Sequence, residues 1–400
     1  MFRFAGFLNF SNFFMTTPTS TIALAPAIQS VQWILPCRQL SASIDFLTQR
    51  LGFKVRMILP SDAPRIAVLS AHGCHLRLEQ SDDDSVPLAA QHLRLLCDKS
   101  LLPPEVSSLP ARLQGPDGLQ IELVDMLPQL QIPAGTQEFV LTRMQSDAAG
   151  RAVWGSGRAG MLYRDLIPSR LGGRFVASHI RIPDAGPVPD YVHFHRVRFQ
   201  MIYCKSGWVR LVYEDQGEPF ILQAGDCVLQ PPEIRHRVLE ASAGLEVIEI
   251  GCPAIHETCG DPEMALPTSQ YRPERFFQDQ QFVHHQLAYA QWHPAALKGF
   301  GARDTGIAAA TQGLADVRVL RAGAGAMSDS TAPADMQQHQ GEFLFFFVLS
   351  GSANLLSISP TGVARTDHLQ ANDCVCLPTE SRYVWQAQGA LELLQVSMPG

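Results

Sequence analysis

The chain has 400 residues, of which 46% are hydrophobic and 17% charged, and its formal net charge is −7. This length exceeds one ordinary domain core, so we expect a globular protein of two to four domains. The acidic balance disfavours nucleic-acid binding, which needs a basic surface. No apolar run is long enough to span a membrane, so we expect neither a nucleic-acid partner nor a membrane partner.

The nine cysteines are odd in number and lack the spacing of a disulfide framework. They are typical of reduced thiols, which predicts a cytoplasmic protein. Residues 1–27 begin with a phenylalanine-rich stretch and continue into threonine, serine and proline. They are either a signal or transit segment or a disordered, mis-started tail, with Met15 beginning the working protein.

A first module of the α+β class is expected over residues 28–128. Ser41 is a plausible N-cap, leucine and isoleucine recur at helical spacing from Ile44 to Leu51, and Gly52 ends the helix. One strand precedes this helix and three follow it, which indicates a βαβββ unit. The predicted strands are Val31–Leu35, Phe53–Ile58, Arg65–Ser70 and His75–Glu79.

This module resembles the vicinal oxygen chelate family, which includes glyoxalases and extradiol dioxygenases. The resemblance rests on Leu35-Pro36, Leu40, Asp45-Phe46, Leu51-Gly52-Phe53 and the turn Gly115-Pro116-Asp117-Gly118 before Ile121-Glu122-Leu123. It implies a second metal site at Gln32, Glu79, His92 and Glu122. Only one of these four residues is a histidine, and prolines occupy the place of the second unit's helix. The alternative is therefore a scaffold without metal.

Two histidine-containing segments stand in the middle of the chain. The first is His193-Phe194-His195 followed by Gln200, and the second runs from Gly225-Asp226-Cys227 to His236. Alternate residues of a strand point to one face, so His193 and His195 share a face. If both segments lie on neighbouring strands, three imidazoles and one amide converge. Imidazole is a common metal ligand; the alternative is that these histidines only pack and hydrogen-bond.

These segments resemble the two motifs of the cupin superfamily, whose domains are jelly-roll β-barrels. Gln200 stands where the first motif has a glutamate, and Glu233 replaces a glycine of the second. The resemblance implies a metal held by His193, His195, Gln200 and His236.

The last third of the chain repeats the middle third. Residues 222–228 (LQAGDCV) match residues 369–375 (LQANDCV), and Gly225 against Asn372 fits a turn that needs a left-handed backbone. Two cupin barrels make a bicupin: barrel 1 over 129–255, a connector over 256–281 and barrel 2 over 282–400. The expected fold class is thus mainly β, two cupin barrels after a βαβββ domain.

Barrel 2 is expected to lack a metal. His339 aligns with His195, but Gln337, Leu344 and Tyr383 replace the other three ligands. The apolar run from Phe343 to Leu349 predicts a strand buried between two sheets, so we expect the barrels to pack face to face.

Three neutral imidazoles and a neutral amide would leave one divalent metal with its full charge, which favours an anionic chelating substrate. Resemblance to three-histidine cupin dioxygenases implies a metal-dependent oxidoreductase, a dioxygenase of a small enol, catechol or organic acid. Fe(II) is favoured, with Mn, Ni or Zn as alternatives. Tyr191, Arg198 and Arg235 are candidates to orient the substrate. A non-catalytic ligand-binding or sensor protein, a metal-dependent isomerase or lyase, and a homo-oligomer remain open.

Residues 155–160 (GSGRAG) match the dinucleotide-binding pattern GxGxxG. Pro168 closes off the helix that must follow, and no βαβ unit surrounds the match. We interpret this segment as a loop that enters barrel 1.

Overall fold

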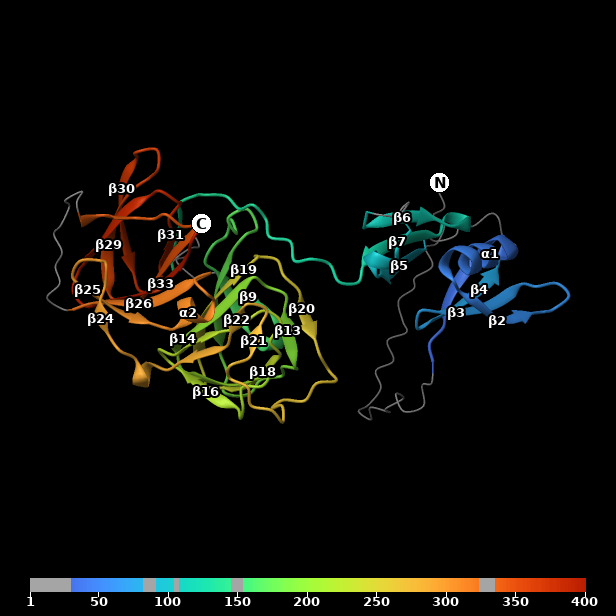
Figure 1. Cartoon of the computed structure of the whole chain (residues 1–400), viewed down its shortest axis with the longest axis horizontal. Helices are drawn as coiled ribbons and strands as arrows, with labels where there is room; N and C mark the ends of the chain where they lie inside the picture. The colour runs from blue at the N-terminus through green and yellow to red at the C-terminus, as the bar shows by residue number, and fades with distance from the viewer. Residues whose placement is uncertain (1–29, 82–90, 104–107, 145–153, 324–334) are drawn as a thin grey trace, which may run out of the picture. The chain divides into compact units, whose positions relative to one another are not determined.

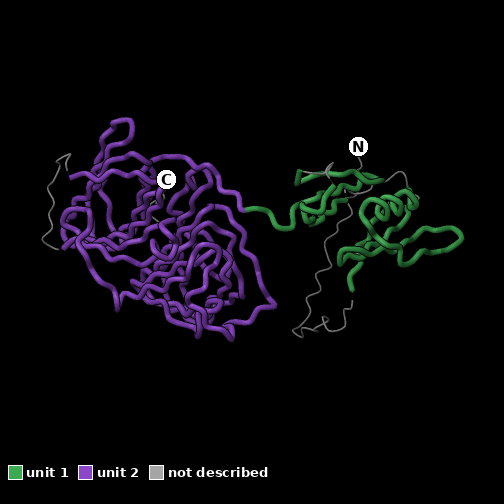
Figure 2. Tube along the Cα trace, in the orientation of Figure 1, with its two compact units in different colours: residues 1–129 green, residues 130–400 purple. Residues whose placement is uncertain are grey.

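A computed structural model describes residues 30–81, 91–103, 108–144, 154–323 and 335–400 (Figure 1). The chain forms two compact units, residues 1–129 and 130–400 (Figure 2). The expected tail over residues 1–27 lies outside the described residues. The described part of the chain is mainly β. No helix in the described part of the chain has both the length and the apolar character needed to cross a membrane.

The first half of unit 1 has the βαβββ order that the sequence predicts. Its sheet has the order β1-β4-β3-β2, with β1 parallel to β4. Gly52 ends the helix in the predicted left-handed conformation, with φ 72°. Ser41 is not the N-cap, because the helix begins at Leu40, two residues earlier than that cap requires, and Gln39 takes the N-cap position without a side-chain bond. The elements are β1 (Trp33–Cys37), α1 (Leu40–Leu51), β2 (Lys54–Leu59), β3 (Ile66–Ala71) and β4 (Cys74–Gln80).

The second half of unit 1 is a smaller sheet of order β5-β7-β6, with β5 parallel to β7. Its strands are β5 (His92–Cys97), β6 (Ala111–Gln114) and β7 (Gln120–Asp125). Between β5 and β6, the described residues hold a short 3₁₀ turn and no α-helix, as the prolines there predict. Leu47, Leu76 and Ile121 lie in one core cluster to which both sheets contribute residues.

Two sheets of unit 2 enclose one core and form what we call barrel 1. The larger sheet has the order β23-β17-β14-β19-β11-β10-β9 and the smaller one β16-β15-β18-β13-β20. The larger sheet comprises β9 (Gly155–Ser156), β10 (Leu162–Asp165), β11 (Val176–Ile182), β14 (Phe199–Ser206), β17 (Cys227–Leu229), β19 (Leu245–Cys252) and β23 (Val283–His285). The smaller sheet comprises β13 (His193–His195), β15 (Trp208–Tyr213), β16 (Phe220–Gln223), β18 (His236–Ala241) and β20 (Thr258–Gly260), and β12 (Gly186–Pro187) pairs with β18.

Barrel 2 repeats this arrangement with sheets of order β24-β25-β26-β33-β28-β31-β8 and β27-β32-β29-β30. Its larger sheet comprises β8 (Val140–Thr142), β24 (His293–Pro294), β25 (Phe300–Asp304), β26 (Asp316–Ala322), β28 (Phe343–Ser350), β31 (Cys374–Cys376) and β33 (Leu391–Met398). The smaller sheet comprises β27 (Gln337–Gln338), β29 (Ser352–Ile358), β30 (Ala364–Gln370) and β32 (Arg382–Ala387). Outside the sheets lie the hairpin β21 (Phe276–Phe277) and β22 (Gln280–Gln281) and the helix α2 (Ile307–Ala310).

The two barrels exchange strands. β8 precedes barrel 1 in the chain but pairs with β31 of barrel 2, whereas β23 follows barrel 1 and pairs with its β17. The segment expected to be a connector, residues 256–281, also contributes β20, which pairs with β13. Boundaries drawn along the sequence therefore do not coincide with the edges of the sheets.

The larger sheets of the two barrels pack against one core cluster that contains residues of both. On β28, Phe343, Phe345 and Phe347 face this shared core, while Leu344 and Phe346 face the interior of barrel 2. The strand is thus buried on both faces, as its continuous apolar pattern predicts. Face-to-face packing of the barrels is confirmed.

The repeated turns have the same backbone in both barrels. Gly225 has φ 94° and Asn372 has φ 76°, so both occupy the left-handed region that the sequence repeat predicts. A Cβ on Gly225 would lie 2.5 Å from Leu287 Cδ2, so a larger residue there would require the Leu287 side chain to move. The next residue in each turn, Asp226 or Asp373, caps it by accepting a backbone N–H at 3.0 or 3.1 Å.

Candidate metal centre

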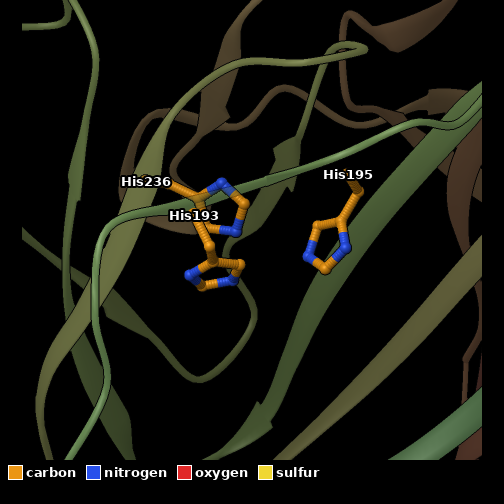
Figure 3. Close-up of side chains that lie close together, drawn as sticks. All are labelled: His193, His195 and His236. Carbon is orange, nitrogen blue, oxygen red and sulfur yellow. The ribbon is translucent and has the colours of Figure 1, made fainter. Parts of the chain in front are cut away.

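His193, His195 and His236 converge inside barrel 1 (Figure 3). His193 on β13 lies directly opposite His236 on the antiparallel strand β18, and His195 is two residues further on the same face. One nitrogen of each ring lies within 4.8 Å of the corresponding nitrogens of the other two. The pairing of the two motifs in one sheet is therefore what brings three imidazoles together.

Each imidazole is held through its Nδ1 atom. His193 Nδ1 lies 2.7 Å from the carbonyl oxygen of Tyr191, and His236 Nδ1 lies 3.0 Å from that of Ile234. His195 Nδ1 lies 3.1 Å from the hydroxyl of Thr258, which β20 supplies. A backbone carbonyl on Nδ1 fixes the tautomer that leaves the Nε2 lone pair free, which is the usual support of a metal-binding histidine.

The three rings are uncharged. Burial lowers the pKa of His193, lowers that of His195 to about 2, and lowers that of His236 well below its usual range. Their mutual proximity acts in the same direction, because a second positive charge would be repelled. A metal binds only the neutral imidazole, so this donor set fits a divalent transition metal without a prior loss of protons.

Gln200 is buried beside this cluster on β14, in a chain of side-chain hydrogen bonds. Its Oε1 accepts from Gln230 Nε2 at 3.0 Å, and the Gln230 carbonyl accepts from the hydroxyl of Tyr213 at 2.9 Å. Gln230 Nε2 also lies 3.1 Å from His236 Nε2. The amide of Gln200 further hydrogen-bonds Glu249 on the neighbouring strand β19, and burial raises the pKa of that carboxyl. Gln230 and Glu249 are site residues that the sequence motifs did not reveal.

Arg158 is a third residue that sequence reasoning missed. Its Nη1 donates to Asp190 at 2.5 Å, and its Nη2 lies 2.6 Å from His193 Nε2. Arg158 belongs to the GxGxxG segment, which forms β9 and a 3₁₀ turn and leads into β10 of barrel 1, as expected. The signal was present as an arginine in a glycine-rich loop, but nothing in the sequence places it against His193.

None of the predicted substrate-orienting residues lines the cavity beside the histidines. Arg198 donates to Glu342 at 2.5 Å and so joins the two barrels. Arg235 donates to Asp261 at 3.0 Å and stacks on the ring of Phe194. Tyr191 is 53% exposed, and its carbonyl rather than its hydroxyl contacts the site. Arg158 is instead the arginine that lines this cavity.

A cavity of about 80 Å³ extends from the histidines into barrel 1. Its polar end is formed by His195, His236, Gln230, Glu249 and Arg158, and the rest of its wall is mainly aliphatic. Such a wall excludes water and strengthens electrostatic interactions at the polar end.

The corresponding position of barrel 2 keeps one of the four ligands. His339 is 5% exposed, burial lowers its pKa to about 4, and its Nδ1 accepts from the Gly341 N–H at 3.3 Å. Tyr383 lies where His236 lies in barrel 1, and its register partner Gln337 takes the place of His193. In the described part of the chain, the His193 cluster is the one group of three or more histidine, cysteine or acidic ligands within such reach.

Unit 1 does not bring its four predicted ligands together. Gln32 and His92 are exposed, Glu79 pairs with Arg77 at 2.5 Å, and Glu122 pairs with Arg94 at 3.3 Å.

No protein-family model matches the chain, and no curated protein matches it. Solved structures with a similar fold include a deletion mutant of Bacillus subtilis oxalate decarboxylase, with 14% identity and a TM-score of 0.47, covering 68% of this chain and 80% of that chain. Lactobacillus farciminis oxalate decarboxylase in a formate complex has 13% identity and a TM-score of 0.45, covering 62% and 84%. The Bacillus subtilis enzyme studied for its Mn(II) centres has 15% identity and a TM-score of 0.47. These values are too low to transfer a metal, a substrate or a reaction to this chain.

Proposed function

We propose that barrel 1 is a metal-dependent cupin enzyme that acts on a small organic acid, and that its reaction is an oxidation by dioxygen. The observation that carries the proposal is the convergence of three neutral imidazoles, each held through Nδ1. His193, His195 and His236 would hold the metal, with Gln200 as a fourth, neutral donor. Fe(II) is the first metal to test, followed by Mn, Ni and Zn.

A redox-active divalent metal in this position would supply Lewis acidity and electron transfer. The residues of the chain supply the rest. Arg158 offers a positive charge to an anionic substrate, and the aliphatic wall excludes water. Gln200, Gln230 and Tyr213 form a hydrogen-bonded chain beside His236. The carbonyl of Ile234 on Nδ1 orients the His236 ring, and the Gln230 amide would give up its contact with His236 Nε2 when that nitrogen binds a metal.

An oxygen electrode tests this function. The full chain is loaded separately with Fe(II), Mn(II) and Ni(II) and supplied with diketones, catechols, 2-oxo acids and thiol acids. We expect dioxygen uptake with one acid class in the metal-loaded protein and none in His193→Ala. Absence of uptake with every metal, together with tight binding of a small anion, would instead favour a non-catalytic binding protein, which the small size of the cavity also suits.

For the remaining domains we propose a division of labour. Barrel 2 acts as a structural partner, since its exchanged strand β23 completes the sheet of barrel 1. Unit 1 acts as a vicinal-oxygen-chelate-like scaffold without metal, which the separation of Gln32, Glu79, His92 and Glu122 supports.

A further inference from the structure

The cavity of barrel 1 has two ends of opposite chemistry. His195, His236, Gln230, Glu249 and Arg158 form one end, and Arg158 is the one arginine or lysine of the lining. The other end is built from inward-facing residues of β11, β15 and β19, among them Ile180, Leu211 and Val247. These side chains alternate along their strands with residues of the opposite face, so the apolar wall belongs to the barrel's own pattern.

Arg158 is held where it can receive an anion. Asp190 is fully buried, accepts from Arg158 Nη1 at 2.5 Å and accepts the Val238 N–H at 2.9 Å, which fixes the carboxylate that orients the guanidinium. The second contact, from Arg158 Nη2, goes to His193 Nε2. When His193 binds a metal, the lone pair on Nε2 goes to the metal. The Nη2 donor of Arg158 then needs another acceptor. A carboxylate at the polar end matches it, because a guanidinium N–H forms a strong charge-assisted hydrogen bond with a carboxylate oxygen.

The opposite end of the cavity does not suit a second carboxylate. Burying an anion against aliphatic side chains without donors is unfavourable. A short apolar group, by contrast, gains from burial there. The cavity is small, about 80 Å³, so a group of a few carbon atoms suits it.

We propose that the substrate is a monocarboxylate with a small aliphatic group, whose carboxylate binds Arg158 and whose aliphatic group fills the apolar end of the barrel 1 cavity. This inference rests on the proposed metal-dependent function and specifies its substrate class. The substrate proposed for this chain therefore differs from oxalate, which consists of two carboxylates.

The test compares three ligands that chelate a metal through the same pair of oxygens. All three have the form R–C(=O)–COO⁻, where R is O⁻ in oxalate, which completes the second carboxylate, a hydrogen in glyoxylate and an isopropyl group in 3-methyl-2-oxobutanoate. Calorimetric titration of the Mn(II)-loaded full chain should give at least tenfold tighter binding of 3-methyl-2-oxobutanoate than of oxalate, the reverse of the preference of the free ion. Oxalate binding as tightly or more tightly would overturn the proposal.

Two variants test the two ends separately. Arg158→Gln should weaken binding of 3-methyl-2-oxobutanoate at least tenfold while leaving that of its neutral amide within twofold. Val247→Phe should weaken the binding of 3-methyl-2-oxobutanoate at least tenfold and leave the binding of glyoxylate unchanged. The melting temperature of this variant without ligand shows whether the barrel is intact. Equal effects on acid and amide, or on the two oxo acids, would overturn the assignment of the corresponding end. Failure of the unaltered chain to hold Mn(II) at all, measured by mass spectrometry, would overturn the proposed function itself and is distinguishable from these results.

Discussion

Arg158 Nη2 lies 2.6 Å from Nε2 of His193, the same atom that the three-histidine cluster offers to a metal. Arginine has no acceptor atoms and stays protonated, so the contact requires the Nε2 lone pair to be the acceptor. The carbonyl of Tyr191 on Nδ1 supports that tautomer. The guanidinium and a divalent cation therefore compete for one lone pair and repel each other.

Removing this competitor should tighten metal binding. We expect Arg158→Gln to raise the affinity for Mn(II) or Zn(II) about tenfold, which corresponds to about 1.4 kcal/mol, because both a positive charge and a donor to His193 disappear. Competition for the metal against a fluorescent chelator measures this affinity. Arg196→Gln is the matched control, since it removes the same charge from an arginine that pairs with Glu257 instead. A similar gain in both variants would mean that net charge alone is responsible.

Metal content should depend on barrel 1 and not on barrel 2. We expect His236→Ala to reduce the affinity by about 100-fold or more, a larger loss than usually follows from removing a group that merely supports a ligand. His339→Ala should retain one metal per chain, because its neighbours Gln337, Leu344 and Tyr383 supply no further imidazole. Inductively coupled plasma mass spectrometry of the dialysed proteins gives the ratio. Loss of metal from both variants would contradict the assignment.

His339 should make the protein less stable in mild acid. Its pKa is about 4 in the folded state because of burial, against 6.5 in the unfolded chain. Below pH 6.5 the unfolded state therefore binds the proton first, so stability falls as the pH falls from 6.5 toward 4. The loss is about 1.4 kcal/mol per pH unit, or roughly 2 kcal/mol at pH 5.

Urea unfolding at pH 7 and pH 5 measures this contribution as a difference between proteins. His339→Gln should lose less stability between the two pH values than the unaltered chain, because glutamine does not titrate. His293→Gln, at an exposed position, should retain the full dependence. Parallel curves for all three proteins would show that the His339 ring is protonated in the folded state.

Much of the fold could be predicted because short stretches of the sequence determine it. The helix from Leu40 to Leu51 and its left-handed end at Gly52 follow from spacing and from glycine's freedom at positive φ. The double burial of β28 follows from its unbroken apolar run. The strand exchange did not follow, because β8 and β23 are three residues long and pair with strands far along the chain. Nothing in three residues specifies such a partner.

The residues of the site likewise fall into those that the sequence could predict and those that it could not. His193, His195 and His236 were predictable since a period of two and a paired strand fix their faces. Arg198 and Arg235, the candidates to orient a substrate, do not line the cavity. A sequence shows a charge but not the carboxylate that pairs with it, here Glu342 and Asp261. Arg158 was missed for the complementary reason: its partner Asp190 is remote in sequence, and the loop between them has no motif that fixes its path.

Two arginines at matching positions of the repeat should carry much of the cohesion between the barrels. Arg303 Nη1 donates to the carbonyl of Gly225 at 2.8 Å, and Arg164 Nη2 donates to the carbonyl of Asn372 at 2.8 Å, so each barrel's arginine satisfies the other barrel's turn. Arg303 is 2% exposed and Arg164 is 3% exposed. A charged donor to a buried carbonyl contributes about 1.5–3 kcal/mol, and its removal leaves that carbonyl unpaired.

We therefore expect Arg303→Met and Arg164→Met each to lower the free energy of unfolding of unit 2 by about 2–3 kcal/mol. Arg318→Met on β26 is the control, because this half-exposed arginine pairs with Asp316 at 2.9 Å and a surface pair is worth about 0–1 kcal/mol. Calorimetry of the full chain resolves the transition of unit 2. Losses no larger than that of Arg318→Met would show that the apolar core shared by the two large sheets holds the barrels together without these bonds.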